Sequence, residues 1–263
     1  MAQKIVTVRY GSRVVKIKVS NDSDFIQNRI LTTKAFYEEP LLVDAVSRLL
    51  PGDLCIDVGA NIGNHTLFFS AVCEASVIAI EPHKENSDLL IDNVKLNQLD
   101  HLVSVHRIAA GQSSGRGNLT VTDPGNTGKA RFTTDPGGLL EVVRLDDLLD
   151  GERAVKLMKV DVEGMELEVL KGAAGILQRD RPHLYVEASL PKEFLAVQGY
   201  LANFGYLETG RFNATATYSF ESPPSDGASI RSLMRSVALM RAEVRELSNR
   251  VREFEAKALK PEG

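Results

Sequence analysis

The sequence predicts a doubly wound α/β domain with an N-terminal β-hairpin and a C-terminal coiled-coil helix. Short apolar runs alternate with helical segments of about 10 to 15 residues, a pattern typical of βαβ units and a parallel sheet. A different apolar repeat, of about 3.5 residues, begins near the C-terminus. The chain therefore divides into a lead-in over 1–50, a core domain over 51–220, a linker over 221–228 and a helix over 229–263.

The lead-in carries hairpin and helical patterns. Lys4–Arg9 and Val14–Val19 alternate apolar and polar side chains around a turn that contains Gly11, which predicts a β-hairpin. Helical patterns follow in pieces between residues 22 and 50 and end at Pro51-Gly52, a stop signal for a helix.

The core domain contains the repeating strand and helix units. The predicted strands are Asp53–Val58, Ser76–Ile80, Val103–Ile108, Val155–Val160 and Pro182–Glu187, and the predicted helices are Asn64–Glu74, Lys84–Asn97, Glu163–Gln178 and Pro191–Phe204. The Gly- and Pro-rich segment Arg116–Val143 interrupts this alternation and predicts an antiparallel excursion. Tyr206–Tyr218 predicts a terminal hairpin.

The last segment has apolar residues at alternating steps of three and four. They are Ile230, Leu233, Val237, Met240, Val244, Leu247, Val251, Phe254 and Ala258. The first core positions Ile230, Val237, Val244 and Val251 are β-branched, which favours a parallel two-stranded coil, while Met240 and Phe254 weaken this preference. We expect self-association through 229–263. A single amphipathic helix that folds back on the domain, or one that docks a different protein, remains the alternative.

Composition and charge exclude several classes of protein. The chain of 263 residues is 43% hydrophobic with a net charge of −4, which argues against a general nucleic-acid-binding protein. It has no signal-peptide pattern and no apolar stretch near the roughly 18 residues that span a bilayer. Cys55 and Cys73 lack metal-ligand spacing and are read as buried thiols in a reducing compartment.

These features predict a cytoplasmic protein without a transmembrane segment. The 229–263 segment carries eight Lys or Arg against five Glu, a net charge of +3, and could contact the acidic inner face of a membrane. Its charges alternate in sign, so a solvated coiled-coil flank is the preferred interpretation.

A glycine-rich turn follows the first core strand, in the stretch CIDVGANIGNH. Gly59, Ala60, Asn61 and Gly63 make a tight turn between that strand and a helix, at the edge of the sheet where doubly wound folds bind ligands. Glu81, followed by Pro82, ends the second strand. A carboxylate at that position can accept both hydroxyls of a ribose.

The glycine spacing favours one nucleoside ligand over another. A dinucleotide fingerprint has glycine at its first, third and sixth positions, whereas Asn61 and Asn64 stand at the last two positions here. Asp57, two residues before Gly59, would repel a pyrophosphate but could hold an ammonium group directly or through water. An adenosine joined to an amino acid fits this charge, so S-adenosylmethionine is preferred to NAD.

Three acids follow later strands. Asp161 directly follows the strand at 155–160, Glu163 stands two residues later, and Glu187 ends the next strand. Carboxylates at adjacent strand ends suit either a general base or a divalent-metal site. For Glu163 the alternative is a structural role at a helix N-terminus, where negative charge is stabilised.

Four ordered motifs, CIDVGANIGNHTLFFS, VIAIEPHKEN, VRLDDLL and MKVDVEGMELEVLKGA, resemble those of the FkbM family of S-adenosylmethionine-dependent O-methyltransferases. The resemblance covers roughly Phe36–Glu187 and implies a Rossmann-like methyltransferase sheet and a hydroxyl acceptor on a polyketide, sugar or surface glycan. It further implies that Asp57–Gly63 surrounds the methionine part of the cofactor and that Glu81 binds the ribose. Ala109 and Ala110, in the turn after the third strand, would border adenine.

Methyl transfer to a hydroxyl benefits from a positioned base, because a sugar hydroxyl is a poor nucleophile at neutral pH. We expect Asp161 to be that base, or a ligand to a cation that acidifies the hydroxyl, with Glu163 and Glu187 in support. His65 is a second candidate base, with a positioning hydrogen bond as its alternative role. A different hypothesis is an assembly module that docks a glycan-biosynthesis partner through 229–263, with methylation secondary.

Overall fold

The computed structural model describes residues 4–121, 130–149 and 151–223. The expected coiled-coil helix at 229–263 and residues 224–228 of the expected linker lie outside these residues. Among the described helices, none is long and apolar enough to cross a membrane.

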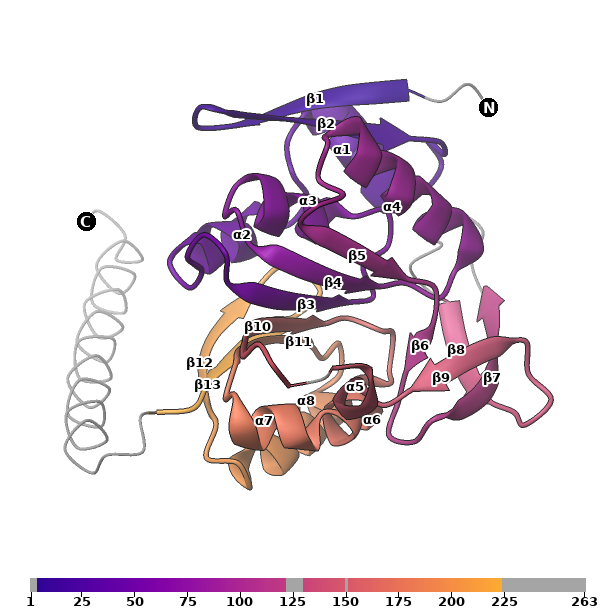
Figure 1. The fold of residues 1–263 in the computed structure, drawn as a ribbon, viewed down its shortest axis with the longest axis vertical. Helices are drawn as coiled ribbons and strands as arrows, with labels where there is room; N and C mark the ends of the chain where they lie inside the picture. The colour runs from indigo at the N-terminus through magenta and orange to yellow at the C-terminus, as the bar shows by residue number, and fades with distance from the viewer. Residues whose placement is uncertain (1–3, 122–129, 150, 224–263) are drawn as a thin grey trace, which may run out of the picture. The chain divides into compact units, whose positions relative to one another are not determined.

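A seven-stranded sheet forms the centre of the domain (Figure 1). Its strands, in spatial order, are β12 (Leu207–Phe212), β13 (Thr217–Glu221), β11 (His183–Glu187), β10 (Val155–Val160), β3 (Leu54–Val58), β4 (Ser76–Ile80) and β5 (Val103–His106). The five strands from β11 to β5 are parallel, while β13 is antiparallel to both of its neighbours. The order of strands reverses between β3 and β10, which is where doubly wound sheets bind ligands. The predicted doubly wound α/β sheet is confirmed.

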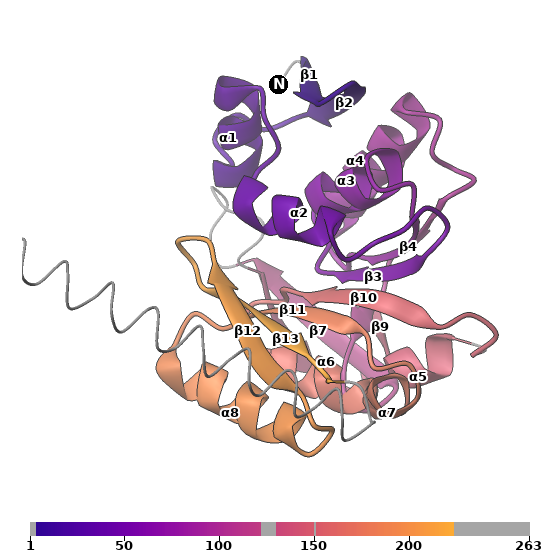
Figure 2. The same ribbon diagram turned by 90° about the vertical axis from the view of Figure 1, so that its left-hand side faces the viewer.

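Helices cover both faces of this sheet (Figures 1 and 2). One face carries α1 (Phe25–Thr33), α2 (Glu39–Val46), α3 (Asn64–Ala71) and α4 (Lys84–Leu96), and the other carries α5 (Leu145–Leu148), α6 (Glu166–Gly172), α7 (Ala174–Arg179) and α8 (Pro191–Ala202). Two hydrophobic clusters result, because successive strand residues point to opposite faces. On β3, for example, Cys55 joins the first cluster and Ile56 joins the second.

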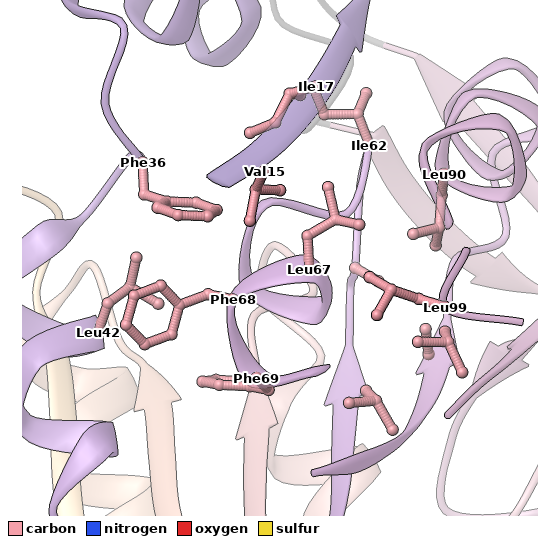
Figure 3. Packing of buried hydrophobic residues seen from close by; sticks show 14 of the residues in the cluster. Val15, Ile17, Phe36, Leu42, Ile62, Leu67, Phe68, Phe69, Leu90 and Leu99 are labelled. Carbon is pink, nitrogen blue, oxygen red and sulfur yellow. The ribbon is translucent and has the colours of Figure 1, made fainter. Parts of the chain in front are cut away.

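The N-terminal hairpin is part of the first cluster. It consists of β1 (Lys4–Tyr10) and β2 (Arg13–Val19), paired antiparallel as predicted. Ile17 of β2 is fully buried in the same cluster as Phe36 and Phe68, whose rings meet edge to face with centroids 5.2 Å apart (Figure 3). The hairpin and α1 are therefore fixed on the sheet by packed apolar side chains.

The predicted antiparallel excursion forms a separate four-stranded sheet. Its order is β6 (Ala109–Ala110), β9 (Leu140–Val143), β7 (Gly115–Val121) and β8 (Ala130–Thr134). β7 pairs antiparallel with both β8 and β9, but β6 and β9 are parallel.

The single helix predicted over Glu163–Gln178 is wrong. Glu163 and Gly164 have positive φ angles of 57° and 97°, so neither residue can continue a right-handed helix. The first helical residue is Glu166, and a second break at Ala173 separates α6 from α7. The terminal hairpin also runs further than predicted, since β13 includes Glu221, the first residue of the expected linker.

Candidate active site

A cleft of about 890 Å³ lies at the carboxyl ends of the central strands. The turn after β3 contributes Gly59, Ala60 and Asn61, and the segment after β4 contributes Glu81 and Pro82. The remaining predicted site residues that line the cleft are Asp161, Glu163, Glu187 and His65. Parallel strands bring these residues together although they are far apart in the sequence.

The strand register explains why the charged residues meet. Lys159 of β10 lies beside Asp57 of β3 on one side and beside Tyr185 of β11 on the other. Side chains of paired residues point to the same face of a sheet, and so do those two residues further along each strand. Asp161 and Glu187 therefore follow Lys159 and Tyr185 on the face that carries α1 to α4.

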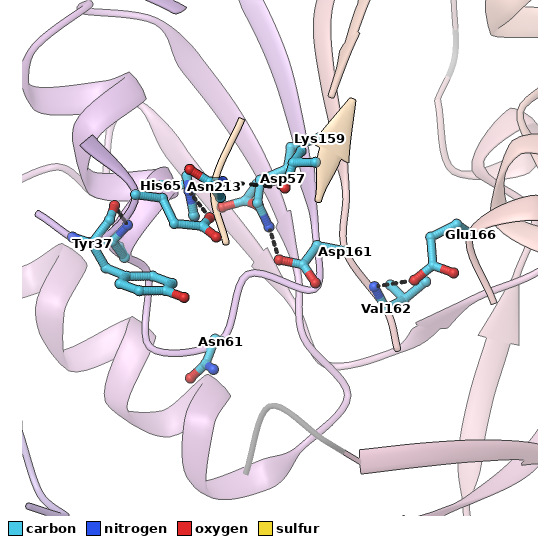
Figure 4. Close-up of polar contacts among 12 residues, drawn as sticks. Tyr37, Asp57, Asn61, His65, Lys159, Asp161, Val162, Glu166 and Asn213 are labelled. Carbon is cyan, nitrogen blue, oxygen red and sulfur yellow. Dashed lines mark hydrogen bonds and ion pairs between the residues drawn. The ribbon is translucent and has the colours of Figure 1, made fainter. Parts of the chain in front are cut away.

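Lys159 is the functional candidate that the sequence interpretation missed. It is only 1% exposed, and its Nζ lies 2.9 Å from Oδ2 of Asp161 and 3.8 Å from Oδ1 of Asp57 (Figure 4). Burial alone would lower the pKa of this lysine, but the two carboxylates outweigh burial and hold the pKa above its ordinary value. The available signal was a lysine inside an apolar strand, because a buried lysine is almost always paired.

Asp161 and Glu187 form a hydrogen-bonded acid pair. Burial opposes the charge of Asp161, but the Lys159 ammonium and a hydrogen bond from Glu187 lower the pKa of Asp161 below its ordinary value. For Glu187, burial and the neighbouring Asp161 charge both raise the pKa. The pair therefore holds one proton near neutral pH, with Glu187 as the donor and Asp161 as the charged acceptor. The Asp161 side chain is 30% exposed and lines the cleft, so a ligand can reach it.

Tyr37 and His65 extend the polar wall of the cleft (Figure 4). Asn64 fixes the backbone of Tyr37, accepting from its N–H and donating to its carbonyl, both at 2.9 Å. Burial, followed by the charge of Glu38, raises the pKa of Tyr37 to about 12. Nε2 of His65 lies 3.1 Å from Oε2 of Glu38 without hydrogen-bond alignment, so this is a charge contact when His65 is protonated.

Asp57 does not line the cleft in the described part of the chain. Its carboxylate is fully buried, with Oδ2 accepting a hydrogen bond from Oγ1 of Thr66 at 2.6 Å and Oδ1 facing Lys159. The expected contact of Asp57 with an ammonium group stays a prediction. The charge of Asp57 acts on two lining residues, because it faces Lys159 and contributes to the raised pKa of Glu81.

Three other predicted site residues are also absent from the described lining of the cleft. The missing side chain of Gly63 would point at Leu90 of α4, since a Cβ there would stand 2.4 Å from Cδ1 of that leucine. Gly63 thus permits close packing of α3 and α4. Ala109 and Ala110 form β6 and are buried, and their proposed contact with adenine remains a prediction.

Gly59 is required where the turn passes the end of β10. Its φ is +79°, and a Cβ would stand 1.7 Å from the carbonyl oxygen of Asp161. The close approach is therefore to the protein's own backbone, at the residue that we expect to act in catalysis.

We predict that Gly59→Ala lowers the free energy of unfolding by about 3 kcal/mol or more, because the clash is with backbone and the conformation is left-handed. Gly11→Ala is the matched control, since Gly11 also has a positive φ but a Cβ added there would meet no atom within 4 Å. The control should cost about 1–2 kcal/mol from backbone conformation alone. Urea denaturation measures both variants, and equal losses would contradict the steric argument.

Glu81 connects the turns after β3 and β4. Its Oε2 accepts the N–H of Asn61 and its Oε1 accepts the N–H of His83, each at 2.8 Å. Burial, only partly offset by these two hydrogen bonds, raises the pKa of Glu81 to about 7. Oδ1 of Asn61 is buried without a hydrogen-bond partner in the described structure, which leaves an acceptor available to a ligand.

Glu166 explains the unusual turn after β10. Its buried carboxylate accepts the N–H groups of Val162, at 3.2 Å, and Gly164, at 3.0 Å. These bonds hold the left-handed conformation at Glu163 and Gly164, so Glu166, and not Glu163, occupies the first helical turn. The helix thus begins three residues after Glu163, and Glu163 lines the cleft. Among the described residues, no group of three or more His, Cys, Asp or Glu could hold a metal ion.

The strand order and the acidic cleft define a Rossmann-like methyltransferase fold. A crystal structure of methyltransferase FkbM from Methylobacillus flagellatus KT has a similar fold, with a TM-score of 0.51 and 22% sequence identity over 64% of this chain and 43% of that chain. The methyltransferase FkbM domain model matches residues 57–208, more than half of the sequence. The chain belongs to the FkbM methyltransferase family.

Curated relatives are also methyltransferases by name. The chain is 33% identical over 128 residues to hexuronic acid methyltransferase AglP of Haloferax volcanii, which covers 48% of this chain and 52% of that protein. It is 30% identical over 188 residues to methyltransferase sdnD of Sordaria araneosa, covering 57% of this chain and 69% of the relative. The match thus spans about half the length of AglP.

Proposed function

We propose that this chain transfers a methyl group from S-adenosylmethionine to a hydroxyl of a sugar, a surface glycan or glycolipid, or a related biosynthetic intermediate. The observation that carries the proposal is the acidic cleft at the carboxyl ends of β3, β4, β10 and β11. Carboxylates suit the sulfonium and ammonium charges of this cofactor and oppose a pyrophosphate. The name of the Haloferax relative, a hexuronic acid methyltransferase, supports a sugar acceptor.

The residues of the first two turns fit the cofactor. We assign Glu81, which lines the cleft, as the acceptor of the ribose hydroxyls, and Oδ1 of Asn61 is a buried acceptor without a partner in the described structure. The backbone of Gly59 and Ala60 borders the same space. When bound, S-adenosylmethionine supplies an electrophilic methyl group with a neutral thioether as the leaving group.

Asp161 is the proposed acceptor of the hydroxyl proton. Lys159 and Glu187 keep its carboxylate ionised at neutral pH, which lowers its basicity but keeps it ready to accept a hydrogen bond. A weak base is sufficient, because the attacking oxygen becomes strongly acidic as its bond to carbon forms. The proton moves from the hydroxyl to Asp161, and alignment of the reactants supplies the rest of the acceleration.

Isothermal titration with S-adenosylmethionine tests the first half of the proposal, and absence of binding at millimolar cofactor would defeat it. Mass spectrometry of glycans from cells with and without the gene tests the second half, through a difference of one CH₂ group. The cytoplasmic location and the self-association through 229–263 expected from the sequence remain proposals.

The raised pKa of Glu81 predicts a pH dependence of cofactor binding. The charged carboxylate accepts hydroxyl hydrogen bonds more strongly than the protonated acid, so affinity for S-adenosylmethionine should increase as the pH rises through about 7. Below that value the affinity should fall by about tenfold per pH unit, the limit for one proton. Titrations between pH 5.5 and 7.5 measure the effect.

Glu81→Gln is the control for this titration, because glutamine keeps the shape without the titration. The variant should bind more weakly at the upper pH and show a flat profile over the same range. A slope that persists in Glu81→Gln would assign the pH dependence to another group. The same pKa has an opposite consequence for folding without ligand: stability should fall as the pH rises from 4.5 towards 7, because the folded state binds the extra proton.

A further inference from the structure

One face of α1 forms part of the cleft wall. Phe25, Arg29 and Thr32 lie at positions i, i+4 and i+7, which fall on the same side of a helix, and all three line the cleft. Gln27 and Ile30 lie on the other side and are buried, so packing fixes the orientation of the helix. The sequence interpretation assigned no function to this helix.

Arg29 is an exposed cation in a predominantly acidic cleft. Within the described structure its guanidinium has no hydrogen bond or ion pair, whereas the nearby Asp22 is paired with Lys4 at 3.1 Å. The other lysine or arginine of the described lining, Lys159, is buried between two carboxylates. A guanidinium binds carboxylate and phosphate groups through paired hydrogen bonds, so Arg29 is suited to a negatively charged group of a ligand.

Phe25 supplies an apolar surface beside this cation. The residue is 58% exposed and lines the cleft, and its ring meets that of Tyr37 edge to face with centroids 6.0 Å apart. An exposed aromatic ring has apolar area to bury, and the C–H face of a sugar ring can pack on it. The hydroxyl of Thr32 adds a polar group along the same helix face.

We propose that this face of α1 is the acceptor subsite and that it selects a sugar bearing a carboxylate or phosphate group. Arg29 binds the charge, and Phe25 packs against the sugar ring. Without Arg29, the acids of the cleft would repel such an acceptor. This inference rests on the proposed methyl transfer to a sugar and identifies the chemical class of the acceptor.

The test compares three probes by isothermal titration: methyl β-glucuronide, glucose 1-phosphate and the neutral methyl β-glucoside. Each is titrated into the full chain saturated with S-adenosylhomocysteine, the product that occupies the cofactor site without reacting. At least one anionic sugar should bind about tenfold or more tightly than the glucoside, as expected for a charge-assisted hydrogen bond. Comparison of the carboxylate and phosphate probes identifies which group Arg29 recognises.

Variants separate recognition from folding. Arg29→Gln should remove the preference for the anionic sugar, Arg29→Lys should keep part of it, and Arg9→Gln, at an exposed position of β1, should leave it unchanged. Failure of S-adenosylhomocysteine to bind would defeat the proposed function itself. If S-adenosylhomocysteine binds but neither anionic sugar binds better than the glucoside, or Arg29→Gln leaves the preference intact, the acceptor inference is overturned.

Discussion

Replacing Asp161 with asparagine is expected to lower kcat by about 10²- to 10⁴-fold, the usual effect of removing a general base. The carboxamide keeps the shape of the side chain but cannot take the hydroxyl proton. Cofactor affinity should change little, because the groups proposed to hold S-adenosylmethionine lie at Glu81 and the turn after β3. Product formation under saturating cofactor gives kcat, and isothermal titration gives the Kd for the cofactor.

Two comparisons make this prediction specific. Asp88→Asn removes an acid outside the cleft that is paired with Lys84 and Arg107, and it should leave kcat unchanged. The thermal unfolding midpoint of each variant reports whether the fold is retained. An Asp161→Asn enzyme that folds and retains full kcat would show that Asp161 is not the base.

The pH dependence of kcat is a second test of Asp161 as the base. Because Lys159 holds the pKa of Asp161 below its ordinary value of 3.8, turnover by this base should stay constant as the pH is lowered from 8 to 5. Turnover that falls within this range would contradict Asp161 as the base. Saturating cofactor must be present throughout, since Glu81 titrates near pH 7 and affects binding.

The order of strands and helices could be predicted because each element has its own local pattern. Ser76–Ile80 and Val155–Val160 are apolar runs with clear boundaries, and the structure has strands at the same residues. The clustering of the acids could also be predicted, because the carboxyl ends of parallel strands lie at one edge of a sheet. Local patterns therefore located the part of the cleft that lies at the ends of β3, β4, β10 and β11.

The interactions that organise the acids depend on non-local pairing. The contact of Lys159 with Asp57 follows from the register of β10 on β3, two strands separated by about a hundred residues, and no local pattern gives that register. The placement of Arg29 in the cleft likewise depends on how α1 packs on the sheet. The helix start at Glu166 was not predicted, because the preceding turn is held by the Glu166 side chain and no apolar periodicity marks it.

Lys159→Met is expected to lower the free energy of unfolding by about 3–5 kcal/mol, the cost of removing one partner from a buried ion pair. Methionine fills much of the same volume, so the loss reflects charge more than a cavity. Asp57 would then be a fully buried carboxylate that keeps its hydrogen bond from Thr66 but has no ammonium beside it. Asp161 would lose the ammonium that lies 2.9 Å from its Oδ2. Lys156→Met, on the same strand but exposed, is the matched control and should cost less than about 0.5 kcal/mol.

The pH dependence of the Lys159→Met defect identifies its cause. Without the ammonium, burial would raise the pKa of Asp161 relative to wild type, so the folded variant would bind protons more tightly than folded wild type. The stability of the variant should therefore increase relative to wild type as the pH is lowered from 7 to 5. Adding Asp161→Asn to Lys159→Met should recover part of the loss, because one of the two uncompensated charges is gone. A defect that is independent of pH and fully additive with Asp161→Asn would mean that Lys159 acts by packing, and that the charge of Asp161 is set by other groups.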